Sequence, residues 1–193
     1  MGRAPRADAC RNRDRLLEVA SAAFARDGVE ASLERIAKDA GVGIGTLYRH
    51  YRNRDALMEA VYRHNLDQLI CDADELSANK PPVEALEEFM QRFVAYVATK
   101  KGLAMHLKTV LSADSDLFTS SQERMNTTVT RLVAAAVESG GIRSDVDAGD
   151  LIRALAGVCM TSDMSVSQEQ PCRISKLLMD GMRYGAPAAT AAS

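Results

Sequence analysis

The chain has 193 residues, of which 47% are hydrophobic, 26% are charged and 5% are aromatic, and its formal net charge is −2. This length suits one domain or two small ones, and the hydrophobic content is enough for a core, which excludes a disordered or low-complexity chain. No apolar run approaches the about 18 residues that span a bilayer, so no membrane partner is expected. The basic N-terminus lacks the apolar stretch of a secretory signal, and the four cysteines show no paired spacing. We therefore expect a cytoplasmic protein with reduced thiols.

The charge is divided unevenly along the sequence. Residues 1–64 contain 12 basic and 9 acidic side chains, whereas residues 65–193 contain 12 basic and 17 acidic side chains. A basic head on an acidic body is compatible with a polyanionic partner for the head alone. Ordinary solvated surfaces also produce such differences, so the charge leaves both interpretations open.

The first part of the chain is expected to contain an arm and three short helices. Residues 1–10 carry arginines, glycine and proline without periodicity, which predicts a disordered basic arm. Apolar residues three and four positions apart predict helices over 11–27, 33–40 and 44–51, each followed or preceded by a glycine. Ser32 is the expected N-cap of the second of these helices.

The rest of the sequence continues in the same periodicity, with no strand alternation. Asn53 is expected to cap a long helix that ends near residue 76, and Gly102 is expected to interrupt the helix that follows the break at 77–82. Further helices are predicted over 103–111, 117–139, 147–162 and 173–184, before a disordered tail over 185–193. The predicted fold class is therefore all-α.

Residues 32–51 have the organisation of a helix-turn-helix motif, in which two short helices meet at a tight turn containing Gly41. The second helix of such a motif enters the major groove with its polar face, while the first lies across the DNA backbone. Leu47 and Tyr51 are expected to pack inside. The residues left polar at the end of the motif are Thr46, Tyr48, Arg49, His50, Arg52 and Arg54.

Residues 33–57, LERIAKDAGVGIGTLYRHYRNRDAL, closely resemble the signature of TetR-family transcriptional regulators, and residues 16–24 with Gly28 match the first helix of that family. The resemblance covers about residues 11–70, and a weaker likeness covers 141–184. It implies an all-α homodimer with a three-helix DNA-binding head over 11–54 and a larger ligand-binding and dimerisation body over 55–184. Gly43 stands where many relatives carry Ser or Thr, so no side-chain contact is expected from it.

The family pattern assigns DNA-binding roles to eight residues: Ser32, Ile44, Gly45, Thr46, Tyr48, Arg49, His50 and Arg54. Thr46 and His50 would face the groove, and Ile44 would contact a thymine methyl group. Ser32, Arg49 and Arg54 would contact phosphates, Tyr48 a phosphate or a thymine, and Gly45 would allow close approach. Tyr48 could instead be half-buried in the core, and His50 could be an ordinary solvated residue.

The body offers many large apolar residues, most of which are expected to form its core. Those that could line a cavity for a partly apolar small molecule are Leu66, Phe89, Phe93, Tyr96, Met105, His106, Met125 and Val129. Two amphipathic helices near the C-terminus could form a two-fold, four-helix dimer interface or pack only within the subunit. Their candidate interface residues are Leu151, Leu155, Val158, Cys159, Ile174, Leu177, Leu178 and Met182.

The resemblance implies a repressor that binds double-stranded DNA at a palindromic operator as a homodimer and is released by a small-molecule effector. The alternatives are a helical interaction module without DNA binding and a redox sensor that uses Cys71, Cys159 or Cys172. The three histidines are scattered, and Gly41–Gly45 follows a helix without the Lys-Ser/Thr of a phosphate-binding loop. We therefore expect no enzyme activity, no metal site and no cofactor.

Overall fold

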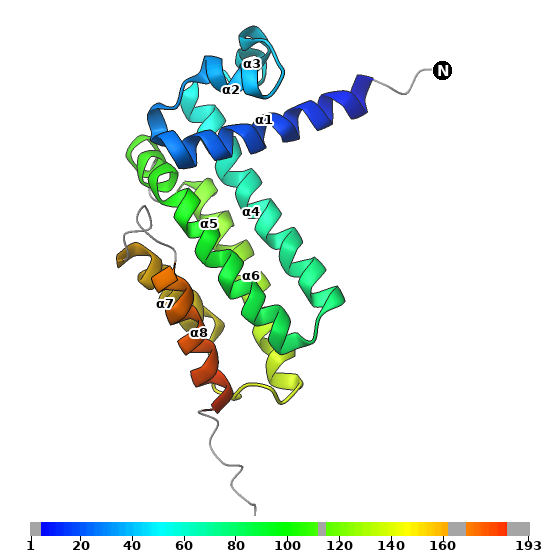
Figure 1. Ribbon diagram of the computed structural model, residues 1–193, viewed down its shortest axis with the longest axis vertical. Coiled ribbons are helices and arrows are strands. Elements are labelled where there is room, and N and C mark those ends of the chain that lie inside the picture. The colour runs from blue at the N-terminus through cyan, green and yellow to red at the C-terminus, as the bar shows by residue number, and fades with distance from the viewer. Residues whose placement is uncertain (1–4, 112–114, 162–168, 185–193) are drawn as a thin grey trace, which may run out of the picture. The chain divides into compact units, whose positions relative to one another are not determined.

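The computed structural model describes residues 5–111, 115–161 and 169–184, and throughout these ranges the regular structure is helical (Figure 1). The predicted all-α class is confirmed, and none of the described helices is long and apolar enough to cross a membrane. The helices are α1 (Pro5–Asp27), η1 (a 3-10 turn, Gly28–Glu30), α2 (Leu33–Asp39), α3 (Ile44–His50), α4 (Arg54–Asn79), α5 (Pro82–Val110), α6 (Asp116–Glu138), α7 (Ala148–Thr161) and α8 (Glu169–Tyr184).

Several helix boundaries differ from the sequence-based expectation, among them the start of α8, which begins at Glu169 and not at residue 173. Helix α1 begins at Pro5, within the stretch expected to be a disordered arm, because proline suits a first helical turn and the alanines and arginines after it favour helix. Helix α5 continues through Gly102, so the expected interruption there is wrong. One glycine costs a helix only about 1 kcal/mol, and burial of Leu103 and Leu107 directly after it offsets that cost. Residues 1–4 and 185–193 lie outside the described part of the chain.

The chain forms two compact units, the first from residues 1–65 and 99–118, the second from residues 66–98 and 119–193. Helices α4 and α5 therefore contribute residues to both units. The first unit includes residues 99–118, which are distant in sequence from the N-terminal helices. Each unit has its own apolar core.

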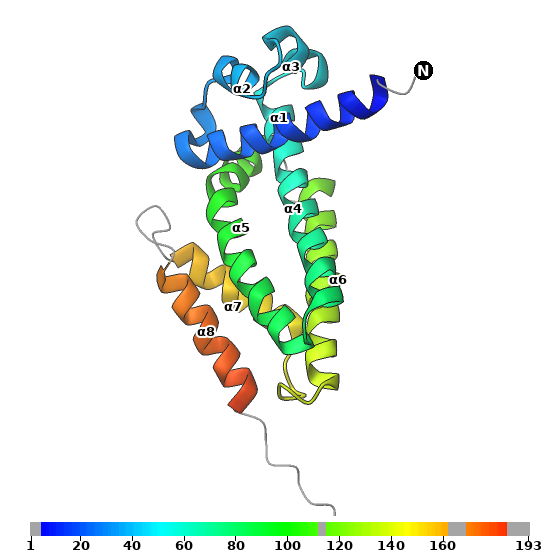
Figure 2. The same cartoon turned by 45° about the vertical axis from the view of Figure 1, so that its right-hand side comes forward.

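In the first unit, α1 packs against α2, and α2 packs against α3 (Figures 1 and 2). Its largest fully buried side chains, each less than 2% exposed, are Leu16, Ile36, Leu47, Leu57, Met58 and Leu107. Leu47 is the buried residue of α3, so this short helix is anchored by one side while its other faces remain available.

A lysine is buried in the same unit. Lys100 is 8% exposed, and its Nζ lies 3.4 Å from the centroid of the Tyr62 ring, which packs edge-on against Phe118. Burial lowers the pKa of Lys100 from 10.5 to about 7. The electron-rich face of the ring favours the ammonium form and partly offsets this cost of burial.

This burial predicts a pH dependence of stability. Between pH 7 and pH 10 the unfolded chain holds a proton on Lys100 that the folded chain has released, so stability rises with pH in this window. The slope contributed by one such group is at most about 1.4 kcal/mol per pH unit. Urea denaturation at pH 7 and pH 9 should show this gain in the wild type, and Lys100→Met should reduce it. An identical gain in both proteins would contradict the assignment to Lys100.

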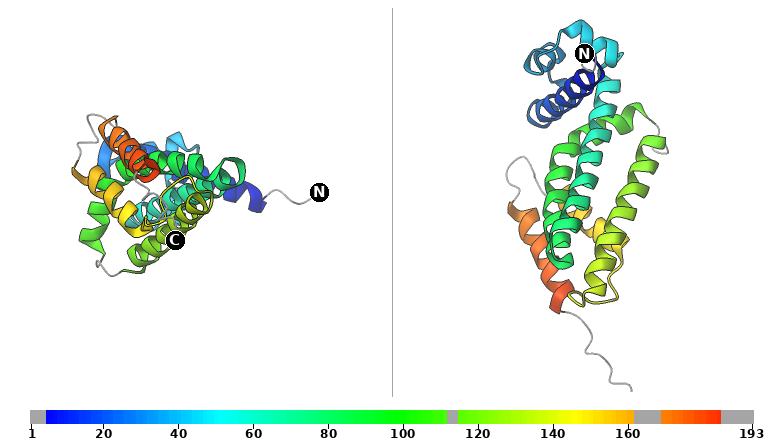
Figure 3. Two further views of the ribbon diagram at one scale, coloured as in Figure 1. Left: turned by 90° about the horizontal axis from the view of Figure 1, so that it is seen from below. Right: turned by 90° about the vertical axis from the view of Figure 1, so that its right-hand side faces the viewer.

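In the second unit, ion pairs join neighbouring helices around the apolar core. Arg124 of α6 contacts Asp67 of α4 at 2.7 Å. About two helical turns further along the same two helices, Arg131 contacts Asp74. Helix α7 packs against α8 (Figure 3). Arg183 of α8 contacts Glu87 of α5 at 2.7 Å. Exposed pairs of this kind each contribute about 0–1 kcal/mol, so the unit depends mainly on its core.

Candidate nucleic-acid interface

The turn between α2 and α3 has the geometry that a helix-turn-helix requires. Ser32 caps α2 by accepting a hydrogen bond from the backbone N–H of Arg35 at 3.2 Å, as predicted. At the other end Gly41 adopts a φ of 75°, a left-handed conformation that side chains disfavour. The N–H of Gly41 donates to the carbonyl of Lys38, and the N–H of Val42 donates to that of Ala37. These two bonds form a Schellman motif, which ends α2 sharply and redirects the chain into α3.

Helix α3 presents most of its surface to solvent. Its N-cap is Gly43, whose carbonyl accepts hydrogen bonds from the N–H groups of Thr46 and Leu47. Leu47 is fully buried, and Tyr51 just after the helix is 7% exposed, so both pack inside as expected. Tyr48 is 47% exposed and Ile44 36%, a substantial exposure for two large apolar side chains on a two-turn helix. Gly45, Arg49 and His50 are also exposed, and Thr46 is half-buried.

This surface brings together the residues that the sequence placed in the groove. Ile44, Thr46, Tyr48, Arg49 and His50 all lie on α3, around the sides not anchored by Leu47. The core alternative for Tyr48 does not fit a side chain that is 47% exposed. A short helix with one buried position and an exposed polar and aromatic surface is the form that docks into a major groove.

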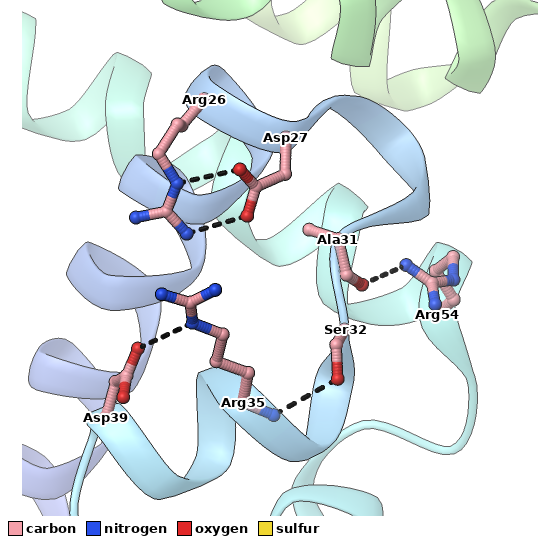
Figure 4. Close-up of polar contacts among 7 residues, drawn as sticks. All are labelled: Arg26, Asp27, Ala31, Ser32, Arg35, Asp39 and Arg54. Carbon is pink, nitrogen blue, oxygen red and sulfur yellow. Dashed lines mark hydrogen bonds and ion pairs between the residues drawn. The ribbon is translucent and has the colours of Figure 1, made fainter.

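Arg54 has a structural role that sequence reasoning missed. Its Nη1 donates to the backbone carbonyls of Val29 and Ala31, at 2.7 and 2.6 Å (Figure 4 draws the contact to Ala31). The guanidinium thus ties the start of α4 to the chain segment that enters α2. The spacing of more than 20 residues between donor and acceptors gave no local signal for this contact. A guanidinium has five N–H donors, so those that are not used in these two hydrogen bonds remain chemically suited to a phosphate.

Ser32 is also engaged within the head. Besides capping α2, its hydroxyl donates to Oε2 of Glu34 at 3.0 Å. The pKa of the Glu34 carboxyl lies below its usual value because it accepts a backbone hydrogen bond and that of Ser32. The carboxylate is therefore ionised at neutral pH and stands beside the position expected to contact a phosphate, which opposes an anion there.

Other charges around the motif are neutralised by neighbours. Arg26 and Asp27 form a two-bond pair at 2.7 and 2.6 Å, and Arg35 lies 3.8 Å from Asp39 (Figure 4). These exposed pairs hold basic side chains close to carboxylates at the α2 side of the motif. Arg49 on α3 and Arg52 two residues after its end are also exposed.

Gly45 yields a prediction with opposite effects on folding and binding. A Cβ added at Gly45 would meet no atom within 4 Å, so the protein itself has room for alanine. Gly45→Ala should stabilise the head by about 0.5–1 kcal/mol, since glycine weakens a helix. The same methyl group should lower operator affinity if the start of α3 lies against DNA. Thermal melts and operator titrations measure the two effects.

Gly102→Ala is the matched control for this substitution, because Gly102 lies within α5 and a Cβ there also meets open space. It should raise stability by a similar amount and leave operator affinity unchanged. Equal operator affinity of Gly45→Ala and wild type would show that Gly45 does not approach the DNA.

The eight candidate ligand-binding residues do not all come together. Leu66, Phe89, Phe93, Tyr96, Met125 and Val129 belong to the core of the second unit. Met105 and His106 belong to the first unit instead, where Met105 is 58% exposed and His106 Nε2 lies 3.0 Å from Asp55 Oδ1.

An open hollow of about 480 Å³ in the second unit is lined by none of the eight candidate ligand-binding residues. Its lining residues are Lys80, Glu84, Glu87, Glu88, Gln91, Arg92 and Ala95.

The eight candidate dimer residues divide into two groups. Leu151, Leu155, Cys159 and Met182 are each less than 9% exposed, so they pack inside the subunit. Val158, Ile174 and Leu178 are half-buried, and Leu177 is 69% exposed. Ile174, Leu177 and Leu178 are three and four positions apart on α8 and form one stripe. The surface that remains for a partner subunit is therefore this stripe with Val158.

Cys71, Cys159 and Cys172 are not joined in disulfides. Cys71 is exposed on α4, Cys172 is half-buried on α8, and Cys159 is buried on α7. Burial of Cys159 accords with its role as a small apolar core residue.

Comparisons with known proteins agree with this geometry. Residues 16–61 match the family described as bacterial regulatory proteins, tetR family, and residues 81–184 match the family described as transcriptional regulator SbtR-like, C-terminal domain. An HTH-type transcriptional regulator of Staphylococcus aureus (strain USA300) is 46% identical over 66 residues, 34% of this chain and 36% of that protein. The chain thus matches about a third of the length of this curated relative.

Solved structures extend the similarity over most of the chain. The TetR transcriptional regulator SCO0520 from Streptomyces coelicolor is 40% identical, with a TM-score of 0.81 over 89% of this chain and 98% of that one. A TetR transcription regulatory protein from Mycobacterium vanbaalenii is 35% identical, with a TM-score of 0.74 over 92% and 98% of the two chains. The N-terminal family match includes the helix-turn-helix, and the two structures match most of the chain. The chain belongs to the TetR family of bacterial transcriptional regulators.

Proposed function

We propose that this protein is a transcriptional repressor that binds a palindromic operator as a homodimer and is released by a small, partly apolar molecule. The observation that carries the proposal is the exposed surface of α3, where one buried leucine anchors a helix whose remaining sides are polar or aromatic. A protein that had lost DNA binding would have no need to keep Ile44 and Tyr48 exposed on a two-turn helix.

The groove-facing side chains divide by chemistry. Thr46 and His50 offer hydrogen bonds to base edges, and Ile44 offers an apolar contact to a thymine methyl group. Arg49 and Arg54 contact phosphates, which position the head without reading sequence. Tyr48 contributes its ring and its hydroxyl at a phosphate or a thymine. Ser32 is the least favoured phosphate contact, because the ionised Glu34 carboxylate lies beside it.

Dimerisation follows from the requirements of operator recognition. Two α3 helices can read one palindrome only if a two-fold dimer holds them about 34 Å apart, in successive major grooves. The stripe of Ile174, Leu177 and Leu178 on α8, with Val158 on α7, supplies an apolar surface for an isologous contact. A four-helix interface from α7 and α8 of each subunit would bury this surface.

The effector would bind in the second unit, among the helices that carry Phe89, Phe93 and Met125. These side chains now form a core, so a ligand must displace or open part of it. Helix α4 contributes residues to both units and therefore offers a covalent route from the effector to the head. The effector can release DNA only if it binds the released conformation more tightly than the DNA-bound one. A repressor of this kind acts in the cytoplasm.

The test is a footprint on the promoter upstream of the protein's own coding sequence, followed by titrations against salt. We expect a protected palindrome, preference over random DNA, and a steep fall of log K with log salt concentration. Addition of candidate apolar molecules should remove the footprint. Binding that is absent, or insensitive to salt and sequence, would instead favour a helical interaction module. Loss of the footprint on oxidation alone, with restoration by thiol, would favour the cysteine-based sensor.

A further inference from the structure

The excess positive charge of the N-terminal third of the chain lies in residues 1–15, ahead of the buried Leu16 and Leu17. Residues 1–15 contain five arginines and two aspartates, whereas residues 16–64 contain seven basic and seven acidic side chains. Residues 16–64, which include the helix-turn-helix and the start of α4, are thus electrically neutral overall. A neutral head attracts DNA weakly, because phosphate neutralisation supplies most of the non-specific affinity of DNA-binding proteins.

The structure shows that much of this basic segment is helical. Helix α1 starts at Pro5, and the side chains from Asn12 to Arg15 are all exposed, whereas Leu16 and Leu17 are 1% and 4% exposed. The part of α1 ahead of the buried Leu16, from Pro5 to Arg15, is eleven residues long, a length of about 16 Å. In Figures 1 and 2 this end of α1 extends past the α2–α3 pair on the side where α3 lies.

We propose that the basic N-terminal extension of α1, residues 5–15, is a second DNA-binding element that contacts the phosphate backbone beside the half-site read by α3. The proposal rests on the proposed DNA-binding function and adds to it a surface outside the helix-turn-helix. A duplex carries one negative charge per about 1.7 Å of its axis, so an arm of this length lies along a segment with about ten phosphate charges. Arg13 and Arg15 are its exposed, described basic side chains, and Arg6 lies two helical turns before Arg13.

The contact is expected to be with phosphates and not with bases. Arginines spaced along one helix beside the groove add affinity that is independent of sequence and sensitive to salt. The extension would thus increase the affinity for operator and random DNA by the same factor, while α3 keeps the preference between them. This division of labour explains how a neutral reading head can belong to a protein with net charge −2 and still bind DNA.

The test uses the full-length protein and two duplexes, its own operator and a random sequence of the same length. Arg13→Gln/Arg15→Gln keeps helix propensity and removes four charges from a dimer. Its slope of log K against log salt concentration should be smaller in magnitude than that of wild type by about 2, because Arg13 and Arg15 are two positions apart on the helix and only one of them in each subunit can face the duplex. Its affinity for both duplexes should fall together, by about tenfold or more at 0.1 M salt.

Arg124→Gln/Arg131→Gln is the matched control, since it removes the same charge from exposed positions of the second unit. This pair should leave the slope unchanged, and a circular-dichroism melt verifies that both variants fold. An unchanged slope in the Arg13/Arg15 variant, beside steep salt dependence in wild type, would overturn the proposal. An equal loss in the control pair would also overturn it, because net charge alone would then be responsible. A wild type without any DNA preference would instead overturn the proposed function.

Discussion

Tyr48→Ala should abolish specific operator binding while leaving a folded dimer. The side chain is 47% exposed, so its removal takes little apolar area out of the core and should change stability by no more than about 0.5 kcal/mol. In the complex, a DNA contact of this kind contributes about 1–3 kcal/mol, and a dimer loses two of them. The operator affinity should therefore fall by a factor between about 30 and 10⁴.

Two further measurements show which part of Tyr48 contacts the DNA and whether the contact is with a base or a phosphate. Tyr48→Phe keeps the ring and removes the hydroxyl, so an intermediate loss would assign the contact to both parts. Affinity for random DNA should fall much less than affinity for the operator if Tyr48 reads a thymine, and by a similar factor if it contacts only a phosphate. Full operator affinity in Tyr48→Ala would refute the role, provided that sedimentation shows the same dimer.

Leu177→Glu should convert the dimer into monomers and, through that change alone, remove operator binding. Leu177 is 69% exposed on α8, so the substitution leaves the subunit core intact. In an isologous interface each substitution appears twice, and two carboxylates would meet or be buried across the two-fold axis. A monomer holds one half-site only, so we expect operator affinity to fall by about 10³-fold or more.

Lys176→Glu is the control for this variant, because Lys176 is exposed and neighbouring positions on a helix point about 100° apart. It should remain a dimer. Sedimentation at micromolar concentration measures both proteins, and an operator with the two half-sites separated by an extra half turn of DNA tests the spacing. A Leu177→Glu protein that stays dimeric with wild-type affinity would show that the subunits meet elsewhere.

The local elements were predictable because their signals lie within a few residues of one another. Ser32 and Asn53 cap the helices that follow them, the latter by accepting the N–H of Ala56 at 2.8 Å. Gly41 adopts the left-handed conformation that ends α2. Leu47 and Tyr51 are buried, as expected from their place in the motif. These features depend on hydrogen bonds over three or four residues and on the conformational freedom of glycine, which sequence displays directly.

The contacts that the sequence did not reveal all join distant residues. Arg54 ties the start of α4 to the carbonyls of Val29 and Ala31, although its position predicted a phosphate contact alone. His106 lies beside Asp55 and not among the apolar ligand candidates. Lys100 is buried on the ring of Tyr62. Periodicity assigns a residue to one face of its own helix, but it does not say which other helix covers that face.

The sequence by itself determined the family, the all-α class and the helix-turn-helix motif, because these follow from local spacing, capping and a highly specific motif. Only the tertiary structure decided how each amphipathic helix uses its apolar face. On α7 and α8 it packs Leu151, Leu155 and Met182 within the subunit and leaves Leu177 exposed. It also begins α1 at Pro5, well ahead of the buried Leu16, which places Arg6, Arg11, Arg13 and Arg15 on a helix. The physical reason is that burial depends on the partner surface, which chain folding brings from residues far away in the sequence.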